Sequence, residues 1–280
     1  MPATTRIAMI GYGAIGMEIA GALARLGEAG NPVATLVRPG RQAPRGVHDV
    51  EALIAARPDV VIECAGHQAV RDYVPALLDA GIDCIVSSIG VLADPEMSGA
   101  LAAAERDGGG QLLLPAGAIA GLDGLVAAAL AGIDTVTYTS YKPPYAWRGT
   151  LAETVIDLDD PASEQIFFEG SARDAAAQYP KNANVSVAVG LAGIGIDRTR
   201  VRLVSSRAVG DPMGVIEAEG AFGRFRFDIL ALASRSNPKT SALTGYSLLQ
   251  CARLGIGLPL AHLGMDHPTG RSYDSWSEDQ

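Results

Sequence analysis

A glycine-rich turn close to the N-terminus constrains the fold of this chain more strongly than any other feature. The short apolar run 7–10 ends at Gly11, and Gly13 and Gly16 complete a G-x-G-x-x-G pattern. An apolar-faced helical pattern starts directly after this turn. A strand, a tight glycine turn and a helix in this order are typical of a parallel βαβ unit.

The chain up to about residue 116 continues with strands that alternate with helices. Strands are predicted at 33–37, 59–63, 82–87 and 111–114, and helices at 47–57, 68–80 and 95–106. Because parallel strands need a crossover connection, which is usually a helix, this alternation predicts an α/β fold with a doubly wound parallel Rossmann sheet.

The pattern changes beyond residue 116. Strands are predicted at 135–141, 165–168, 200–205, 215–219 and 224–229, and helices at 120–131, 172–178 and 185–194. This order indicates a second, α+β domain built on a mostly antiparallel sheet. We expect 1–116 plus 240–254 to form the Rossmann domain, with 240–254 as a returning helix. Residues 117–239 then form the second domain, and 255–280 a loosely ordered tail.

Composition excludes several classes of protein. The 280 residues carry a net charge of −9, which argues against a general nucleic-acid binder or a protein of anionic membranes. The apolar stretch 111–133 is interrupted by proline and glycines, so it predicts a buried strand and helix rather than a membrane span. The three cysteines and four histidines show no metal-ligand spacing, and the N-terminus shows no signal-peptide pattern. We therefore expect a cytoplasmic protein without a bound metal.

The glycine motif predicts a site for a dinucleotide. Gly11 permits the tight turn, Gly13 lets a pyrophosphate approach the backbone, and Gly16 lets the helix pack closely on the strand. Ala14 and Ile15 begin that helix, whose free amide groups and dipole attract phosphates. A glycine-rich turn without a ligand is the alternative.

The end of the second predicted strand bears on the choice of cofactor. An acidic residue there holds the ribose 2′-hydroxyl of NAD, whereas an arginine accommodates the 2′-phosphate of NADP. The segment contains Arg38 and Arg41 and no acidic residue. We therefore expect NADP or NAD, with NADP preferred, unless both arginines are merely solvated.

Ligands of open α/β sheets bind beyond the carboxyl ends of the strands. Ala65, Gly66 and His67 follow the strand 59–63, and Ser87 follows the next strand. We expect these residues to line the cofactor cleft. His67 is either a polar group near the nicotinamide or an ordinary first residue of a helix.

Six segments of the sequence resemble the L-aspartate dehydrogenase family over about residues 6–254. They are IGYGAIG, AGHQAVRDYVPALLDAGIDCIVSSIG, PAGAIAGLDGL, FEGSARDAAAQYPKNANVSVAVGLAG, GAFG and NPKTSAL. The resemblance implies NAD(P)-dependent oxidation of L-aspartate to oxaloacetate and ammonia, or the reverse reductive amination. It also implies cofactor contacts at Ala118 and Asn184, although Asn184 would suit a helix N-cap equally well.

The resemblance breaks at one position. The family's catalytic histidine precedes the strand that ends in G-x-F-G, and the matching residue here is Gly214. Glycine cannot exchange a proton, and general acid–base catalysis typically contributes 10²–10⁴-fold. The chain is therefore expected to be a slow aspartate dehydrogenase. The alternatives are an NADPH-dependent reductase of another imine or carbonyl compound, or a catalytically impaired cofactor-binding relative.

Lysine is rare in this chain. Of 22 basic residues only Lys142, Lys181 and Lys239 are lysines, and all lie beyond residue 116. A retained lysine in an arginine-rich chain suggests a compact charge at a site, although an ordinary surface charge is the alternative. The candidates to replace the missing catalytic histidine are His67, Lys142 and Lys239. The candidate substrate-binding residues, for a small dicarboxylic amino acid or its imine or keto acid, are Lys142, Lys181, Asn182, Lys239 and Thr240. A homodimer is expected by analogy alone.

Overall fold

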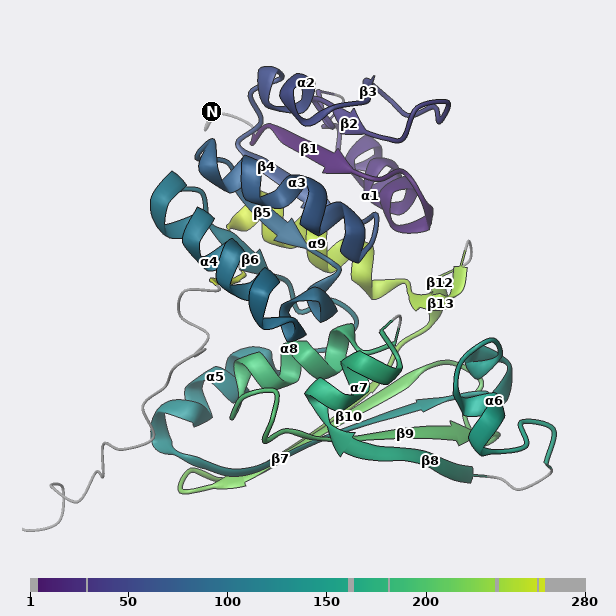
Figure 1. The fold of residues 1–280 in the computed structure, drawn as a ribbon. Coiled ribbons are helices and arrows are strands. Elements are labelled where there is room, and N and C mark those ends of the chain that lie inside the picture. The colour runs from purple at the N-terminus through teal and green to yellow at the C-terminus, as the bar shows by residue number, and fades with distance from the viewer. Residues whose placement is uncertain are drawn as a thin grey trace, which may run out of the picture.

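The first half of the chain forms the predicted parallel sheet (Figure 1). The computed structural model describes residues 5–28, 30–160, 164–180, 182–234, 237–255 and 257–259. The strand order is β14-β6-β5-β4-β1-β2-β3, in which the six strands from β6 to β3 run parallel. Their bounds are β1 Ile7–Ile10, β2 Thr35–Leu36, β3 Gly46–Val47, β4 Val60–Glu63, β5 Asp83–Val86 and β6 Leu112–Leu114.

Helices cover both faces of this sheet, which explains why its central strands are apolar along their whole length. The helices α1 Ala14–Arg25 and α9 Leu243–Leu254 pack together on one face. The helices α3 His67–Asp79 and α4 Pro95–Gly108 pack together on the other, while the short α2 Val50–Ala55 lies near the β2 edge. Burial of the apolar faces of these helices against the sheet stabilises the layers.

The second half of the chain forms a five-stranded sheet with the order β11-β10-β7-β9-β8. Three of its four strand pairs are antiparallel, and β7 and β9 run parallel. In Figure 1 the helices α5, α7 and α8 lie on the face of this sheet that is turned toward the first sheet. The bounds are α5 Leu122–Ala131, β7 Ile133–Lys142, β8 Glu164–Ser171, α7 Ala172–Gln178, α8 Asn184–Ala192, β9 Arg200–Ser206, β10 Met213–Gly220 and β11 Gly223–Leu230.

The two sheets share one apolar core. The 3-10 helix η1 Ile89–Ala93 follows β5 and packs against α8 and α7. The Arg173 guanidinium donates to the Ala93 carbonyl, and it also pairs with Asp197. The ends of β4, β5 and β6 therefore face the second sheet across a short, packed connection.

The segment before α9 differs from the prediction. Lys239 and Thr240 were expected at the start of a helix, but Asn237–Ser241 is the strand β13, paired with β12 Ala233–Ser234. The helix begins only at Leu243, whose backbone amide donates to the Ser241 hydroxyl. Local capping residues suggested a helix here, whereas the hairpin is stabilised by pairing that a local pattern does not reveal.

The structure contains other elements that the sequence did not predict. The strand β3 and the short helices η2 Pro144–Trp147 and α6 Ala152–Val155 were missed. Within the predicted tail, β14 Leu258–Pro259 pairs antiparallel with β6 and closes one edge of the first sheet. Residues 256 and 260–280 of the predicted tail lie outside the described residues. None of the described helices is long and apolar enough to cross a membrane.

Candidate functional site

The turn between β1 and α1 has the geometry that a bound pyrophosphate requires. Gly11 has a φ of +96°, and a Cβ added to it would lie 2.9 Å from the Cβ of Ala65. A Cβ on Gly16 would lie 2.7 Å from the Gly11 carbonyl oxygen, so this glycine permits the close helix–strand contact. A Cβ on Gly13 would meet nothing within 4 Å. The backbone at Gly13 is therefore open to a ligand at the start of α1.

A groove runs from this turn along the ends of β2 and β4. The residues that line it include Gly11, Gly13, Ala65, Arg38 and Arg41. Both arginines are exposed in the loop after β2. Gln68 and Asp72 of α3 also line the groove and hydrogen-bond to each other. The groove therefore has two exposed cations in the loop after β2.

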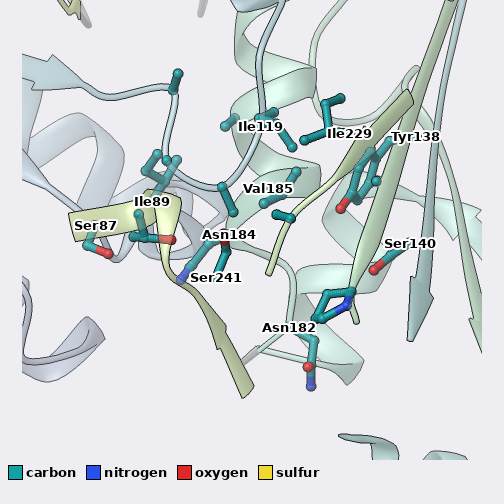
Figure 2. A pocket seen from close by; sticks show the side chains of 18 of the residues that line it. Ser87, Ile89, Ile119, Tyr138, Ser140, Asn182, Asn184, Val185, Ile229 and Ser241 are labelled. Carbon is teal, nitrogen blue, oxygen red and sulfur yellow. The ribbon is translucent and has the colours of Figure 1, made fainter. Parts of the chain in front are cut away.

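A cavity of about 180 Å³ lies between the first sheet and the second. The loops after β5 and β6 contribute Ser87 and Ala118 to its lining, and α1 contributes Ile15. Figure 2 shows Tyr138 and Ser140 at one wall of the cavity and Ser87 and Asn184 at the opposite side. Ser140 is buried on β7, two residues from Tyr138.

Lys142 is the last residue of β7 and lines the same cavity, because alternate side chains of a strand share one face. Its ammonium donates to Asn182 Oδ1 at 2.8 Å and lies 4.9 Å from the centre of the Trp147 ring. Since Asn182 accepts with its oxygen, its amide hydrogens face elsewhere and can donate. A cation and an amide therefore meet at one end of the cavity.

Asn184 is fixed at the start of α8 by contacts with the first domain. Its Oδ1 accepts the Gly90 backbone N–H at 2.9 Å and lies 3.2 Å from His67 Nε2. Because Oδ1 is the acceptor, Nε2 must carry a hydrogen. The Nδ2 group of Asn184 then points away from both partners. The N-cap alternative is wrong, because Asn184 is the first helical residue and makes no side-chain cap.

A buried carboxylate hydrogen-bonds to the loops that line the groove and the cavity. Glu63 ends β4 and is 1% exposed. Its Oε1 accepts from the backbone amides of Ala65 and Gly66 at 2.6 and 2.7 Å and from the Ser88 hydroxyl at 3.1 Å. Its Oε2 accepts from the Ser88 amide at 3.1 Å. Burial raises the pKa of Glu63, while these hydrogen bonds oppose that rise.

Gly214 lines the cavity opposite Ser140, its partner across β7 and β10. A Cβ at this glycine would lie 3.3 Å from Tyr138 Cε2 and 3.4 Å from the Tyr138 hydroxyl. Tyr138 is 4% exposed, and burial raises its pKa to about 12. A hydrogen bond with Ser140 acts in the opposite direction.

The predicted site residues separate into three groups. Those that line one of the hollows are Gly11, Gly13, Ile15, Arg38, Arg41, Ala65, Ser87, Ala118, Lys142, Asn182, Asn184 and Gly214. Those that line neither the groove nor the cavity are Ala14, Gly16, Gly66 and His67, and the His67 ring is directed at Asn184. Lys181 and the side chains of Lys239 and Thr240 lie outside the described residues.

Sequence reasoning missed Glu63, Tyr138 and Ser140 as site residues. The signal was the alternation of Tyr138, Ser140 and Lys142 at every second residue of the strand TYTSYK, which places them on one face. Glu63 was recognisable as an acidic residue at the end of an apolar strand, directly before the cleft residues.

Comparison with known proteins agrees with this geometry. The family "Aspartate dehydrogenase, C-terminal" matches residues 123–254. L-Aspartate dehydrogenase of Ruegeria pomeroyi is 44% identical over 254 residues, which are 89% of this chain and 91% of that protein. The chain belongs to the aspartate dehydrogenase family. The Serratia proteamaculans member is 41% identical over 90% of this chain and 98% of its own length.

The first sheet and the overall arrangement also match this family. The family "Homoserine dehydrogenase, NAD binding domain" matches residues 11–115, which supports the use of NAD(P) in the groove. The crystal structure of aspartate dehydrogenase from Thermotoga maritima superposes with a TM-score of 0.71 at 25% identity, over 90% of this chain and 97% of that one. This family member thus has the same pairing of a Rossmann sheet with a second mixed sheet.

Proposed function

We propose that this chain is an NAD(P)-dependent dehydrogenase of L-aspartate, which also catalyses the reductive amination of oxaloacetate. The observation that carries the proposal is the cavity itself. It joins the strand ends next to a dinucleotide groove with the cationic end of β7 at Lys142. A small anionic substrate held there would lie against the nicotinamide end of the cofactor.

The described residues fit NAD(P), which supplies hydride transfer when bound. The amides at the start of α1, beside the open face of Gly13, would hold the pyrophosphate. Asn184 would donate its Nδ2 hydrogens to the carboxamide of the nicotinamide, because Gly90 and His67 occupy its oxygen. His67 then orients the amide and takes no part in proton exchange with the substrate.

The cation and amide at Lys142 and Asn182 would bind a carboxylate of the substrate. Charge-assisted hydrogen bonds are roughly twice as strong as neutral ones, and the half-buried position reduces competition from water. Lys181, Lys239 and Thr240 remain candidate substrate contacts from the sequence alone.

Purified protein is expected to consume NADPH only when oxaloacetate and ammonium are both present. Binding in the cavity orients the imine carbon against the hydride donor, and ketone without ammonium lacks the imine. The measurement is the loss of NADPH absorbance, with each substrate omitted in turn. Consumption with oxaloacetate alone would instead indicate a carbonyl reductase.

NADPH is expected to bind more tightly than NADH, because Arg38 and Arg41 flank the ribose end of the groove and no acidic residue follows β2. The double substitution Arg38→Ala/Arg41→Ala should weaken NADPH binding about tenfold or more, equal to about 1.4 kcal/mol, and leave NADH binding nearly unchanged. Fluorescence titration of both cofactors measures this. Equal losses for the two cofactors would contradict a role for the arginines at the 2′-phosphate.

The described cysteines are free thiols, which supports a reducing compartment such as the cytoplasm. The homodimer inferred by analogy stays a prediction.

A further inference from the structure

The proposed reaction needs a group that exchanges a proton with the substrate inside the cavity. Among the described residues that line it, Tyr138 and Lys142 are the two with titratable side chains. The Lys142 ammonium already donates to Asn182 and stacks over Trp147, which suits a carboxylate site. His67 is directed at Asn184 and does not line the cavity. Of the described titratable side chains in the cavity lining, Tyr138 is therefore the one that remains available for proton exchange.

The phenol of Tyr138 lies in the space beside Gly214. A Cβ at this position would come within 3.3 to 3.5 Å of the Tyr138 ring, its hydroxyl and Ile119. The 3.3 Å contact is tighter than ordinary van der Waals packing, so a side chain at position 214 would press on the ring of Tyr138 where it now lies. Glycine on β10 therefore permits the phenol of β7 to reach the cavity.

We propose that Tyr138 is the catalytic acid–base residue of this chain, acting from the space that Gly214 leaves open. The inference rests on the proposed aspartate dehydrogenase function and adds the group that moves the proton. Gly214 then does more than mark the absence of a histidine, because it makes room for a different catalytic group.

The proton transfer balances in the direction of reductive amination. Ammonia adds to the ketone of oxaloacetate to give a carbinolamine. The phenol gives its proton to the carbinolamine hydroxyl as the C–O bond breaks, and water leaves. The nitrogen lone pair forms the C=N bond, so the products are an iminium ion and a phenolate. When bound, NAD(P)H would supply the hydride that converts the iminium to the amine, and the phenolate of Tyr138 regains its proton from solvent. Deamination follows the same steps in reverse, with the phenolate accepting a proton from water.

The surroundings of Tyr138 suit this exchange. The phenol is protonated near pH 7 and can act as an acid, and burial, which raises its pKa to about 12, favours this protonated form further. Its hydrogen bond with Ser140 stabilises the phenolate once the proton has left. The iminium and phenolate then form an ion pair in a cavity of low dielectric, where their attraction is strong.

The test compares two single hydroxyl deletions. Tyr138→Phe is expected to lower kcat for reductive amination at least about 100-fold, because general acid catalysis contributes 10²–10⁴-fold, and to leave the NADPH dissociation constant within about twofold. The matched control is Tyr179→Phe. Tyr179 is also buried in the second domain but packs between Phe167 and Phe168, outside the cavity lining. Its variant should keep wild-type kcat.

A second pair of variants tests the shared space. Tyr138→Ala should be as slow as Tyr138→Phe. Adding Gly214→His to Tyr138→Ala should raise kcat about tenfold or more, because the imidazole can enter the space that the phenol has left. No gain in the double variant would overturn the claim that positions 138 and 214 supply one catalytic group between them.

The outcomes separate the two levels of the argument. An active wild type whose Tyr138→Phe variant keeps kcat within about threefold would overturn the role of Tyr138 and leave the proposed function intact. A wild type that binds NADPH but never turns over oxaloacetate and ammonium would overturn the proposed function and this role with it. A slow Tyr138→Phe variant beside an active wild type and an active Tyr179→Phe variant would support both.

Discussion

Replacing Lys142 by methionine is expected to lower kcat/KM for oxaloacetate by about 100- to 1,000-fold. The ammonium is the one described cation in the cavity lining, and loss of a charge-assisted contact in a desolvated site costs about 3–4 kcal/mol. Methionine keeps an apolar stem over Trp147, so the fold should persist. Initial rates over a range of oxaloacetate concentrations give the value.

The control for this variant removes a surface cation that does not line the cavity. Arg148 lies six residues further along and pairs with Asp159 on the surface. Because exposed ion pairs contribute little, Arg148→Met should leave kcat/KM within about twofold. NADPH affinity should be unchanged in both variants. Wild-type kinetics of Lys142→Met would show that the substrate carboxylates are held elsewhere.

Replacing Glu63 by alanine is expected to weaken NADPH binding about 30- to 100-fold and to lower the free energy of unfolding by about 3 kcal/mol. Four hydrogen-bond donors in the loops at Ala65, Gly66 and Ser88 lose their buried acceptor, at about 1–3 kcal/mol for each group left unsatisfied. These loops line the groove and the cavity, so their displacement disturbs both. Glu63→Gln keeps one acceptor oxygen, so its NADPH affinity and its free energy of unfolding should lie between those of Glu63→Ala and the wild type.

Asp83→Ala provides the matched control for the Glu63 variants. Asp83 also accepts a hydrogen bond from a backbone amide, that of Gln111 at 2.9 Å. It is the first residue of β5, however, and thus lies at the amino-terminal ends of the parallel strands, away from the cofactor loops at their carboxyl ends. Its loss should lower stability modestly, measured by urea unfolding, and should not change NADPH affinity. If Glu63→Ala and Asp83→Ala affected NADPH binding equally, Glu63 would have no special role in shaping the cofactor loops.

The fold was predictable wherever a local pattern carried the information. The glycine turn, the continuous apolar strands and the change to alternating strands after residue 116 identified both sheets. The β12–β13 hairpin was not predictable, because residues such as Thr240 and Ser241 favour a helix cap as readily as a turn. Whether the segment forms a helix cap or a hairpin depends on pairing with a partner strand, and a local sequence pattern does not show that pairing.

The candidate site was predictable only as a set of separate positions. Lys142 was identified from its place at a strand end, but its contact with Asn182 spans 40 residues of sequence. Asn184 was identified by resemblance, yet its partners His67 and Gly90 come from the other sheet, 117 and 94 residues away. The sequence showed Gly214 as a lost histidine. The strand register pairs Gly214 with Ser140, and only the folded structure shows that the ring of Tyr138, two residues away on the same strand, borders the space at Gly214.

An isotope experiment tests the central claim most directly. The wild-type protein is given oxaloacetate, ammonium with heavy nitrogen and NADPH with deuterium at its transferable position, and the product is analysed by mass spectrometry. A dehydrogenase that reduces the imine in this cavity must form aspartate that carries one heavy nitrogen and one deuterium. Deuterated malate without nitrogen, or oxaloacetate left unchanged by a protein that binds NADPH, would contradict it.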